Sequence, residues 1–196
     1  NKAVKSYIIP SSVTSIGNSA FAGCTSLSNI AIPSSVNSIG DKAFWDCCSL
    51  NSIAIPDSVT SIGDGAFCGC SSLKYISIPK NVICLNGNPF FNWNGKLECL
   101  SPNFIYEDDV LFNKDKSKII SCRVQGIRSY IIPDSVTSIG SWAFSGCESL
   151  RSVVIPDSVT SIGRGAFRDS NLPVALAQNL RSRFGKNILV TFYPYP

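Results

Sequence analysis

Apolar residues recur along this chain at a fixed interval of 23 residues. The repeating unit reads L-x-x-I-x-I-P-x-S-V-T-S-I-G-x-x-A-F-x-G-C-x-S, in which two apolar segments flank a proline and an Ala-Phe pair follows a glycine. The prolines that mark the interval are Pro10, Pro33, Pro56, Pro79, Pro133 and Pro156. A period of this length predicts a solenoid, because one such unit can bury its apolar side chains only against its neighbours.

Each segment of the unit predicts one part of a coil. The alternating apolar residues of L-x-x-I-x-I predict a short β-strand, and proline ends that strand because it has no N–H to donate. A second apolar pair follows, as in Val59 and Ile62, and we expect the next residue, Gly63, to allow a tight corner with positive φ. The Ala66-Phe67 pair then predicts a short helical or irregular turn. Stacked coils would place Phe on Phe, with strands about 4.8 Å apart.

The repeat is irregular from residue 80 to residue 132. Val82, Leu85 and Phe90 still match the repeat columns, but the next strand, residues 97–100, arrives one residue late. Residues 106–113 and 117–122 flank a turn-like Lys-Asp-Lys sequence and predict an inserted β-hairpin. The regular repeat resumes from residue 133 to residue 170.

After residue 170 the pattern changes again. Residues 172–185 have apolar side chains at helical spacing, with proline near the start and glycine at the end, which predicts a helix. Residues 188–193 predict a last strand. Residues 171–196 would therefore cap the stack, and the whole chain, 1–196, is predicted to be a single domain with regular repeats over 1–79.

The motifs I-P-x-S-V-T-S-I-G-x-x-A-F-x-G-C and L-x-x-I-x-I-P resemble the BspA-like leucine-rich repeat family over roughly residues 4–170. Asn88-Pro89-Phe90 and residues 110–116 resemble an irregular unit that is common in this family, although Asp109 stands where that unit often has glycine. The resemblance implies a mainly β, right-handed leucine-rich-repeat solenoid with short helical turns, a hairpin insertion and a C-terminal helical cap. It also implies display on a cell surface or secretion, and adhesion to host matrix, plasma or microbial surface proteins. It transfers no catalytic residue.

Composition narrows the classes of function. The 196-residue chain is 44% hydrophobic and 15% charged, with a net charge of +4, so neither a disordered tail nor a nucleic-acid-binding protein is indicated. It contains no histidine, which removes the usual general base and the commonest metal ligand and argues against an enzyme. No apolar run approaches the roughly 18–20 residues of a membrane span. There is no signal peptide at Asn1, and we expect a trimmed chain whose targeting segment has been removed.

Nine cysteines fall into two groups. Four of them occupy one repeat column and are predicted to be buried, reduced thiols: Cys24, Cys47, Cys70 and Cys147. The other five lie outside it: Cys48, Cys68, Cys84, Cys99 and Cys122. A soft-metal site at Cys47-Cys48 and Cys68-x-Cys70 is the alternative, but this spacing is not that of a zinc knuckle, so no cofactor or metal is expected. The odd number argues against a complete disulfide framework and allows one bridge.

The densest acidic cluster is Glu107-Asp108-Asp109. Such carboxylates could serve glycoside hydrolysis or bind Ca²⁺. The simpler interpretation is a solvated turn before a strand of the hairpin.

The best candidate for a binding surface is the outward side of the predicted strands. The column after each leucine reads Lys5, Ser28, Asn51, Lys74, Glu98, Arg128 and Arg151, and the next reads Ser6, Asn29, Ser52, Tyr75, Ser129 and Ser152. These residues vary while the core columns stay fixed, as expected where packing does not dictate identity. We predict a polar stripe with scattered positive charge that binds protein through Lys5, Lys74, Tyr75, Arg128 and Arg151.

Three tryptophans could add exposed aromatic anchors to this surface: Trp45, Trp93 and Trp142. Trp93 also matches the cysteine column and would then fill the core. The alternatives to a binding module are a structural spacer within a larger surface protein and a carbohydrate-binding module. The partner, the full-length architecture and the oligomeric state do not follow from the sequence.

Overall fold

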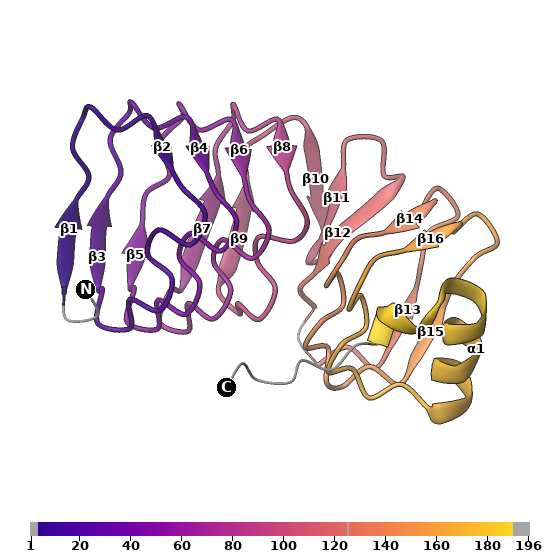
Figure 1. Ribbon diagram of the computed structural model, residues 1–196. Coiled ribbons are helices and arrows are strands. Elements are labelled where there is room, and N and C mark those ends of the chain that lie inside the picture. Colours follow the sequence, from indigo (N-terminus) through magenta and orange to yellow (C-terminus); the bar gives the residue numbers. More distant parts are fainter. Residues whose placement is uncertain (1–3, 125, 190–196) are drawn as a thin grey trace. The chain divides into compact units, whose positions relative to one another are not determined.

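The computed structural model describes residues 4–124 and 126–189 (Figure 1). The chain forms two compact units, residues 1–104 and residues 105–196, and each is described by itself. That they form one domain stays a prediction.

In the first unit the two apolar segments of each repeat form two rows of parallel strands (Figure 1). The segments before proline form β1 (Ser6–Ile8), β3 (Asn29–Ala31) and β5 (Ser52–Ile53) in one sheet, and β7 (Tyr75–Ile78) and β9 (Lys96–Cys99) in another. The segments after proline form a sheet of β2 (Ser15–Ile16), β4 (Ser38–Ile39), β6 (Ser61–Ile62) and β8 (Cys84–Leu85). Equivalent residues of successive coils pair 23 positions apart, as Ser15 does with Ser38, which confirms the predicted solenoid.

The Pro-x-Ser-Val segment makes the corner between the two rows. Val36 N donates a hydrogen bond to Pro33 O, with the nitrogen and oxygen 3.1 Å apart, as in a β-turn. The Ser58 hydroxyl donates to Val36 O of the preceding coil at 2.6 Å. The proline therefore ends the strand as predicted, and the serine joins one corner to the next.

The Ala-Phe pairs lie in irregular turns and carry the aromatic core of the first unit. Phe21, Phe44, Phe67 and Phe90 stack nearly parallel, with ring centroids 5.3, 5.6 and 6.1 Å apart. Trp93 packs on Phe90, is only 2% exposed and donates its indole N–H to Leu73 O at 2.7 Å. The prediction that Trp93 fills the core in place of cysteine is confirmed.

The second unit opens with the predicted hairpin. This unit has two sheets. One contains β10 (Phe104–Glu107), β11 (Val110–Asn113), β12 (Lys118–Cys122), β14 (Ser138–Ile139) and β16 (Ser161–Ile162), and the other contains β13 (Ser129–Ile131) and β15 (Ser152–Val154). β11 and β12 are antiparallel, which confirms the hairpin. β12 also pairs in parallel with β14, so the hairpin's second strand takes the place of a regular coil strand.

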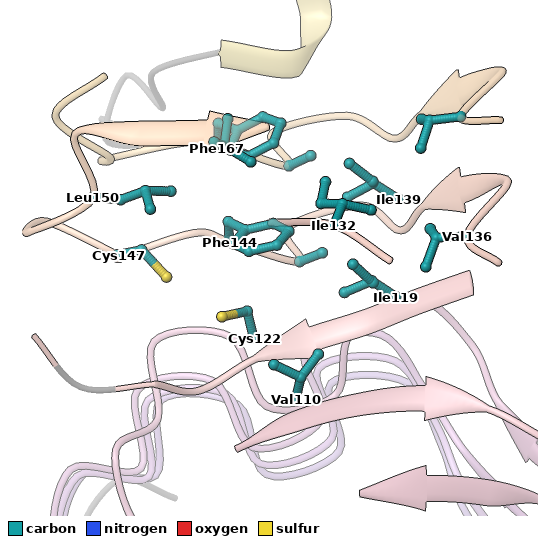
Figure 2. Packing of buried hydrophobic residues seen from close by; sticks show 14 of the residues in the cluster. Val110, Ile119, Cys122, Ile132, Val136, Ile139, Phe144, Cys147, Leu150 and Phe167 are labelled. Atoms are coloured by element: carbon teal, nitrogen blue, oxygen red, sulfur yellow. The ribbon is translucent and has the colours of Figure 1, made fainter. Parts of the chain in front are cut away.

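Hairpin and regular coils share one core in this unit. Val110, Ile119 and Cys122 of the hairpin lie in the same buried cluster as Phe144 and Phe167, whose rings stack at 5.1 Å (Figure 2). The insertion is therefore part of the packed unit and not an appendage.

The C-terminal cap is a helix followed by a short 3₁₀ segment. α1 (Val174–Phe184) buries Leu180, as the helical spacing predicts. The 3₁₀ helix η1 (Lys186–Leu189) buries Ile188, and Phe167 N donates to Ile188 O at 3.1 Å, so η1 supplies acceptors for the last coil. The predicted strand over 188–193 is wrong for residues 188 and 189, because this bonding closes the coil by single hydrogen bonds and not by a ladder. Residues 190–193 lie outside the described residues.

The glycine that recurs before the Ala-Phe turn of each repeat does not have the positive φ that the sequence analysis predicts. No glycine of this column has positive φ. The left-handed residue lies two positions later, for example at Lys42 (φ 56°) and Gly65 (φ 62°). Instead, Gly63 lies against the coil below: a Cβ there would stand 2.3 Å from Asp41 N and 2.5 Å from Gly40 C. The column is glycine because two backbones approach closely.

We therefore predict that Gly63→Ala destabilises the first unit, whereas Gly17→Ala does not. A methyl group at residue 63 must push two coils apart, which should cost about 1–3 kcal/mol. At Gly17, in the first coil, a Cβ meets nothing within 4 Å, and alanine should be neutral or stabilising by up to about 1 kcal/mol. Urea unfolding followed by circular dichroism measures both free energies, and equal effects would refute the close-approach argument.

Candidate functional site

The outward face of the strands before proline is the candidate binding surface, and in the first unit it carries Lys5, Lys74 and Tyr75. Lys5 lies beside Ser28, whose N–H donates to Lys5 O at 2.8 Å, and Asn51 N donates in turn to Ser28 O at 3.2 Å. Lys5 and Lys74 are thus separated by two coils with polar, uncharged residues, a span of roughly 14 Å at about 4.8 Å per coil. All four side chains are outside the core.

The register of β9 corrects the position of Glu98. Tyr75 pairs with Lys96, and Ser77 pairs with Glu98. Glu98 therefore belongs to the column of Ser77 and not, as the sequence suggested, to the column of Lys74. The repeat between β7 and β9 is shorter than 23 residues, whereas the sequence alignment took it as longer. Proline does not follow β9 directly, as Pro79 follows β7, so the register was not marked in the sequence.

Tyr75 is 45% exposed and is held by this neighbour. Its hydroxyl donates to the Glu98 carboxylate, and this hydrogen bond raises the pKa of Tyr75 above its ordinary value. The ring is therefore held in place on the face, and Tyr75 pairs with Lys96 of the next coil.

In the second unit the face brings two arginines together. Arg151 N donates to Arg128 O at 2.8 Å, which sets the two residues on neighbouring coils. The Arg151 guanidinium donates to Glu148 O at 2.7 Å and is thereby oriented by the main chain. Within residues 4–124 and 126–189, neither arginine, nor Lys5 or Lys74, forms an ion pair. Each unit thus presents exposed cations that are not neutralised by a neighbouring carboxylate of the described chain.

Exposed aliphatic residues on the same strands were missed by the sequence argument. Ile131 and Val154 pair directly across β13 and β15 and are 71% and 52% exposed, and Ile8 on β1 is 76% exposed. They occupy the middle position of I-x-I, where strand alternation already points a side chain outward. In the second unit the face therefore combines Arg128 and Arg151 with an apolar pair.

The tryptophans do not join this face as anchors. Trp142 is only 7% exposed and packs against Gly165, where a Cβ would stand 2.2 Å from the ring, so its predicted exposure is wrong. Trp45 is half-buried in the turn that follows Phe44, with the Lys42 ammonium 5.2 Å from its ring centroid and Phe91 edge-on at 5.4 Å. Their residue type indicated anchors, but their place in the Ala-Phe turn decides the packing.

The acidic cluster forms the turn between β10 and β11. Asp108 and Asp109 both have positive φ, 48° and 58°, and both are exposed, as is Glu107. The Tyr106 hydroxyl donates to Asp109 Oδ1 at 2.7 Å, and Glu107 pairs with Lys116 at 2.5 Å. The interpretation as a solvated turn is confirmed, and the left-handed backbone at Asp109 explains why related units favour glycine there.

The cysteine column lies inside the coils. The thiols of Cys47 and Cys70 donate to Phe21 O and Phe44 O of the coils below, each at 3.1 Å, and burial raises the pKa of both to about 12. All nine cysteines are free in the structure. Across residues 4–124 and 126–189, no three of the His, Cys, Asp and Glu side chains gather as a metal site would require.

One cavity, of about 320 Å³, lies at the first coil of the first unit. Its lining is apolar and comprises Val4, Tyr7, Ala20, Phe21, Cys24 and Leu27. The residues 123 positions later, Ile127, Tyr130, Ala143, Phe144, Cys147 and Leu150, belong to the second unit's core, which the hairpin completes.

A ladder of Asn and Asp side chains joins the coils next to the glycine column. Asp41 N donates to Asn18 Oδ1, Asp64 N to Asp41 Oδ1, and Asn88 N to Asp64 Oδ1, each at 2.9 Å. Asp64 is half-buried, and desolvation raises its pKa above the ordinary value of 3.8, with a further rise from the Asp41 charge. The ladder is structural, and Asp64 is its electrostatically costly member.

No helix among the described residues has the length and apolar character needed to cross a bilayer.

This arrangement of 23-residue coils with stacked rows of parallel strands and a variable outward face defines a leucine-rich repeat solenoid. The model of the BspA type leucine-rich repeat region matches six copies, over residues 1–108 and 121–189. The chain belongs to this family, which confirms the resemblance inferred from the motifs.

Solved structures of bacterial proteins have the same fold. A leucine-rich repeat protein from Eubacterium ventriosum is 28% identical, with a TM-score of 0.66 over 84% of this chain and 51% of that one. A leucine-rich cell surface protein from Faecalibacterium prausnitzii is 28% identical, with a TM-score of 0.53 over 85% of this chain and 59% of that one. The pneumococcal vaccine antigen PcpA, 24% identical with a TM-score of 0.65 over 87% of this chain and 50% of that one, shares the fold. This chain thus spans half to three-fifths of these proteins, and no curated protein matches it.

We predict that Asp64→Asn stabilises the first unit at neutral pH. Asparagine keeps the acceptor for Asn88 N–H and removes a desolvated charge. Because the folded-state pKa is raised, ionised Asp64 lowers stability above that pKa, and this cost disappears as the pH falls below 3.8. Unfolding free energies should therefore favour the variant by more than about 0.5 kcal/mol at pH 7 and converge with wild type near pH 3.

Asp57→Asn is the matched control. Asp57 is exposed and pairs with Lys80 at 2.9 Å, so its loss should be neutral or slightly destabilising at pH 7. A loss of stability in Asp64→Asn at pH 7 would contradict the assignment of Asp64 as a costly charge.

Proposed function

We propose that this chain is a non-catalytic protein-binding module of a surface-displayed or secreted protein, and that it adheres through the outward face of its strands. The observation that carries the proposal is the contrast between fixed core columns and a variable strand face that exposes cations. The partners that fit are host matrix, plasma or microbial surface proteins with acidic patches. Family membership and the cell-surface relative from Faecalibacterium prausnitzii support surface display.

The second unit offers the most complete binding surface. Arg128 and Arg151 lie on neighbouring coils directly before β13 and β15, and Ile131 and Val154 form an exposed apolar pair on these two strands. Interfaces combine such apolar contacts with arginine, whose guanidinium binds carboxylates with two donors. In the first unit Lys5, Lys74 and Tyr75 provide a more dispersed version of the same chemistry.

Binding to immobilised fibronectin, fibrinogen and collagen tests the proposal. We predict saturable binding by the wild-type chain and at least a tenfold loss of affinity in Lys74→Glu/Arg128→Glu/Arg151→Glu, because each reversal turns attraction to an acidic patch into repulsion. Binding should also weaken as salt is raised from about 0.05 M to 0.5 M.

The control variant is Lys42→Glu/Lys114→Glu/Arg164→Glu. These three exposed cations lie in the Ala-Phe turns and the hairpin turn, away from the strand face. Each reversal removes one positive charge and adds one negative charge, so both variants go from a net charge of +4 to −2. Equal losses in the two variants would indicate a non-specific charge effect. A folded wild-type chain that binds none of the proteins would favour a spacer within a larger surface protein.

A further inference from the structure

Cys122 occupies a position that is phenylalanine in the regular coils. Its N–H donates to Ala143 O at 2.6 Å, as Phe21 N donates to Ala43 O and Phe44 N to Ala66 O, each at 2.8 Å. The hairpin therefore places a cysteine where the aromatic column would otherwise continue below Phe144. This exchange brings a sulfur atom next to the neighbouring coil's own cysteine.

That neighbour is Cys147, a member of the cysteine column. In the first unit the thiol of the column donates to the carbonyl oxygen of the phenylalanine in the coil below, as Cys47 does to Phe21 O. Cys147 stands in the same relation to Cys122, and here the two thiols form a side-chain hydrogen bond with each other. Figure 2 shows their sulfur atoms pointing toward one another within the core of the second unit.

We propose that Cys122 and Cys147 form a disulfide bond when the protein meets an oxidising environment, and that this bond fastens the hairpin to the regular coils. Both residues belong to one buried cluster, and a main-chain hydrogen bond from Cys122 N to Ala143 O joins the two segments that carry them. A disulfide needs the two sulfur atoms to face each other, as they do in Figure 2. The exposed fractions are 6% and 8%, so the bond would lie inside the core.

The chemistry is a thiol–disulfide exchange with a small-molecule disulfide. The Cys122 thiolate attacks one sulfur of the reagent, forms a mixed disulfide and releases the first thiolate. Cys147 then gives its proton to that thiolate and attacks the Cys122 sulfur, which releases the second. Two protein thiols are oxidised and one reagent disulfide is reduced to two thiols. In the closed core, the hydrogen bond between the two thiols lowers the pKa of Cys122 and raises that of Cys147.

Burial sets when this can happen. A reagent reaches Cys122 only before the core closes, during folding, or when the hairpin separates from the first regular coil. The bond would enclose a loop of about 25 residues and restrict the unfolded chain accordingly.

The test uses the full chain with Cys48→Ser and Cys84→Ser, which removes two exposed thiols that could exchange. The protein is refolded with oxidised glutathione or with a thiol reductant, alkylated, digested and analysed by mass spectrometry. We expect a peptide pair joined through Cys122 and Cys147 only in the oxidised sample, and a thermal midpoint higher by on the order of 5–10 °C. Alkylation of both residues in the oxidised, folded protein, or linkage to other cysteines, would overturn the proposal.

Variants test the consequence for stability. Cys122→Ser and Cys147→Ser should each abolish the difference between the oxidised and reduced midpoints, whereas Cys70→Ala, in the same column of the first unit, should lower both midpoints and keep the difference. A difference that persists in Cys147→Ser would refute the assignment. If a serine variant fails to fold, peptide mapping of the parent chain still decides, because it needs neither substitution.

Discussion

The main-chain hydrogen bonds between successive coils are the constraint on which the rest of the structure depends. They set neighbouring strands about 4.8 Å apart and therefore place every inward residue directly over its equivalent. Phe44 must accept Phe67 as its neighbour, and Gly40 must leave room for Gly63. Because each coil packs against a coil of the same shape, the same side chain recurs at each inward position. For the same reason, one added methyl group can disturb two coils at once.

The same constraint leaves the outward face free. Side chains such as Lys74 and Arg151 meet no equivalent packing requirement, and their identity can follow a partner instead of the core. In the interior, by contrast, thiols such as Cys70 are buried and burial raises their pKa. Recognition by an extended surface fits this division between a repeated interior and a variable outward face.

The sequence predicted the coils well because each one is fixed locally, by proline, by serine and by strand alternation. It predicted details poorly where a neighbouring coil decides. The need for glycine at residue 63 depends on the close approach of Asp41, the burial of Trp142 depends on Gly165, and the register of Glu98 depends on a shortened repeat. The exposed pair Ile131 and Val154 was likewise overlooked, since apolar letters in a strand suggest the core until the pleat is known. The candidate binding residues are exposed as expected, and their role stays a prediction.

The offset of 123 residues between the two first coils bears on how such a gene can change length. A coil presents the same donors and acceptors on both of its edges, so an in-frame duplication of one unit would find its hydrogen bonds already supplied by the copies on either side. The inward side chains of the new coil would already match those of the neighbouring coils. Only its outward residues, which packing does not constrain, would then diverge. Lengthening the protein and acquiring a new binding specificity would therefore be separate evolutionary events.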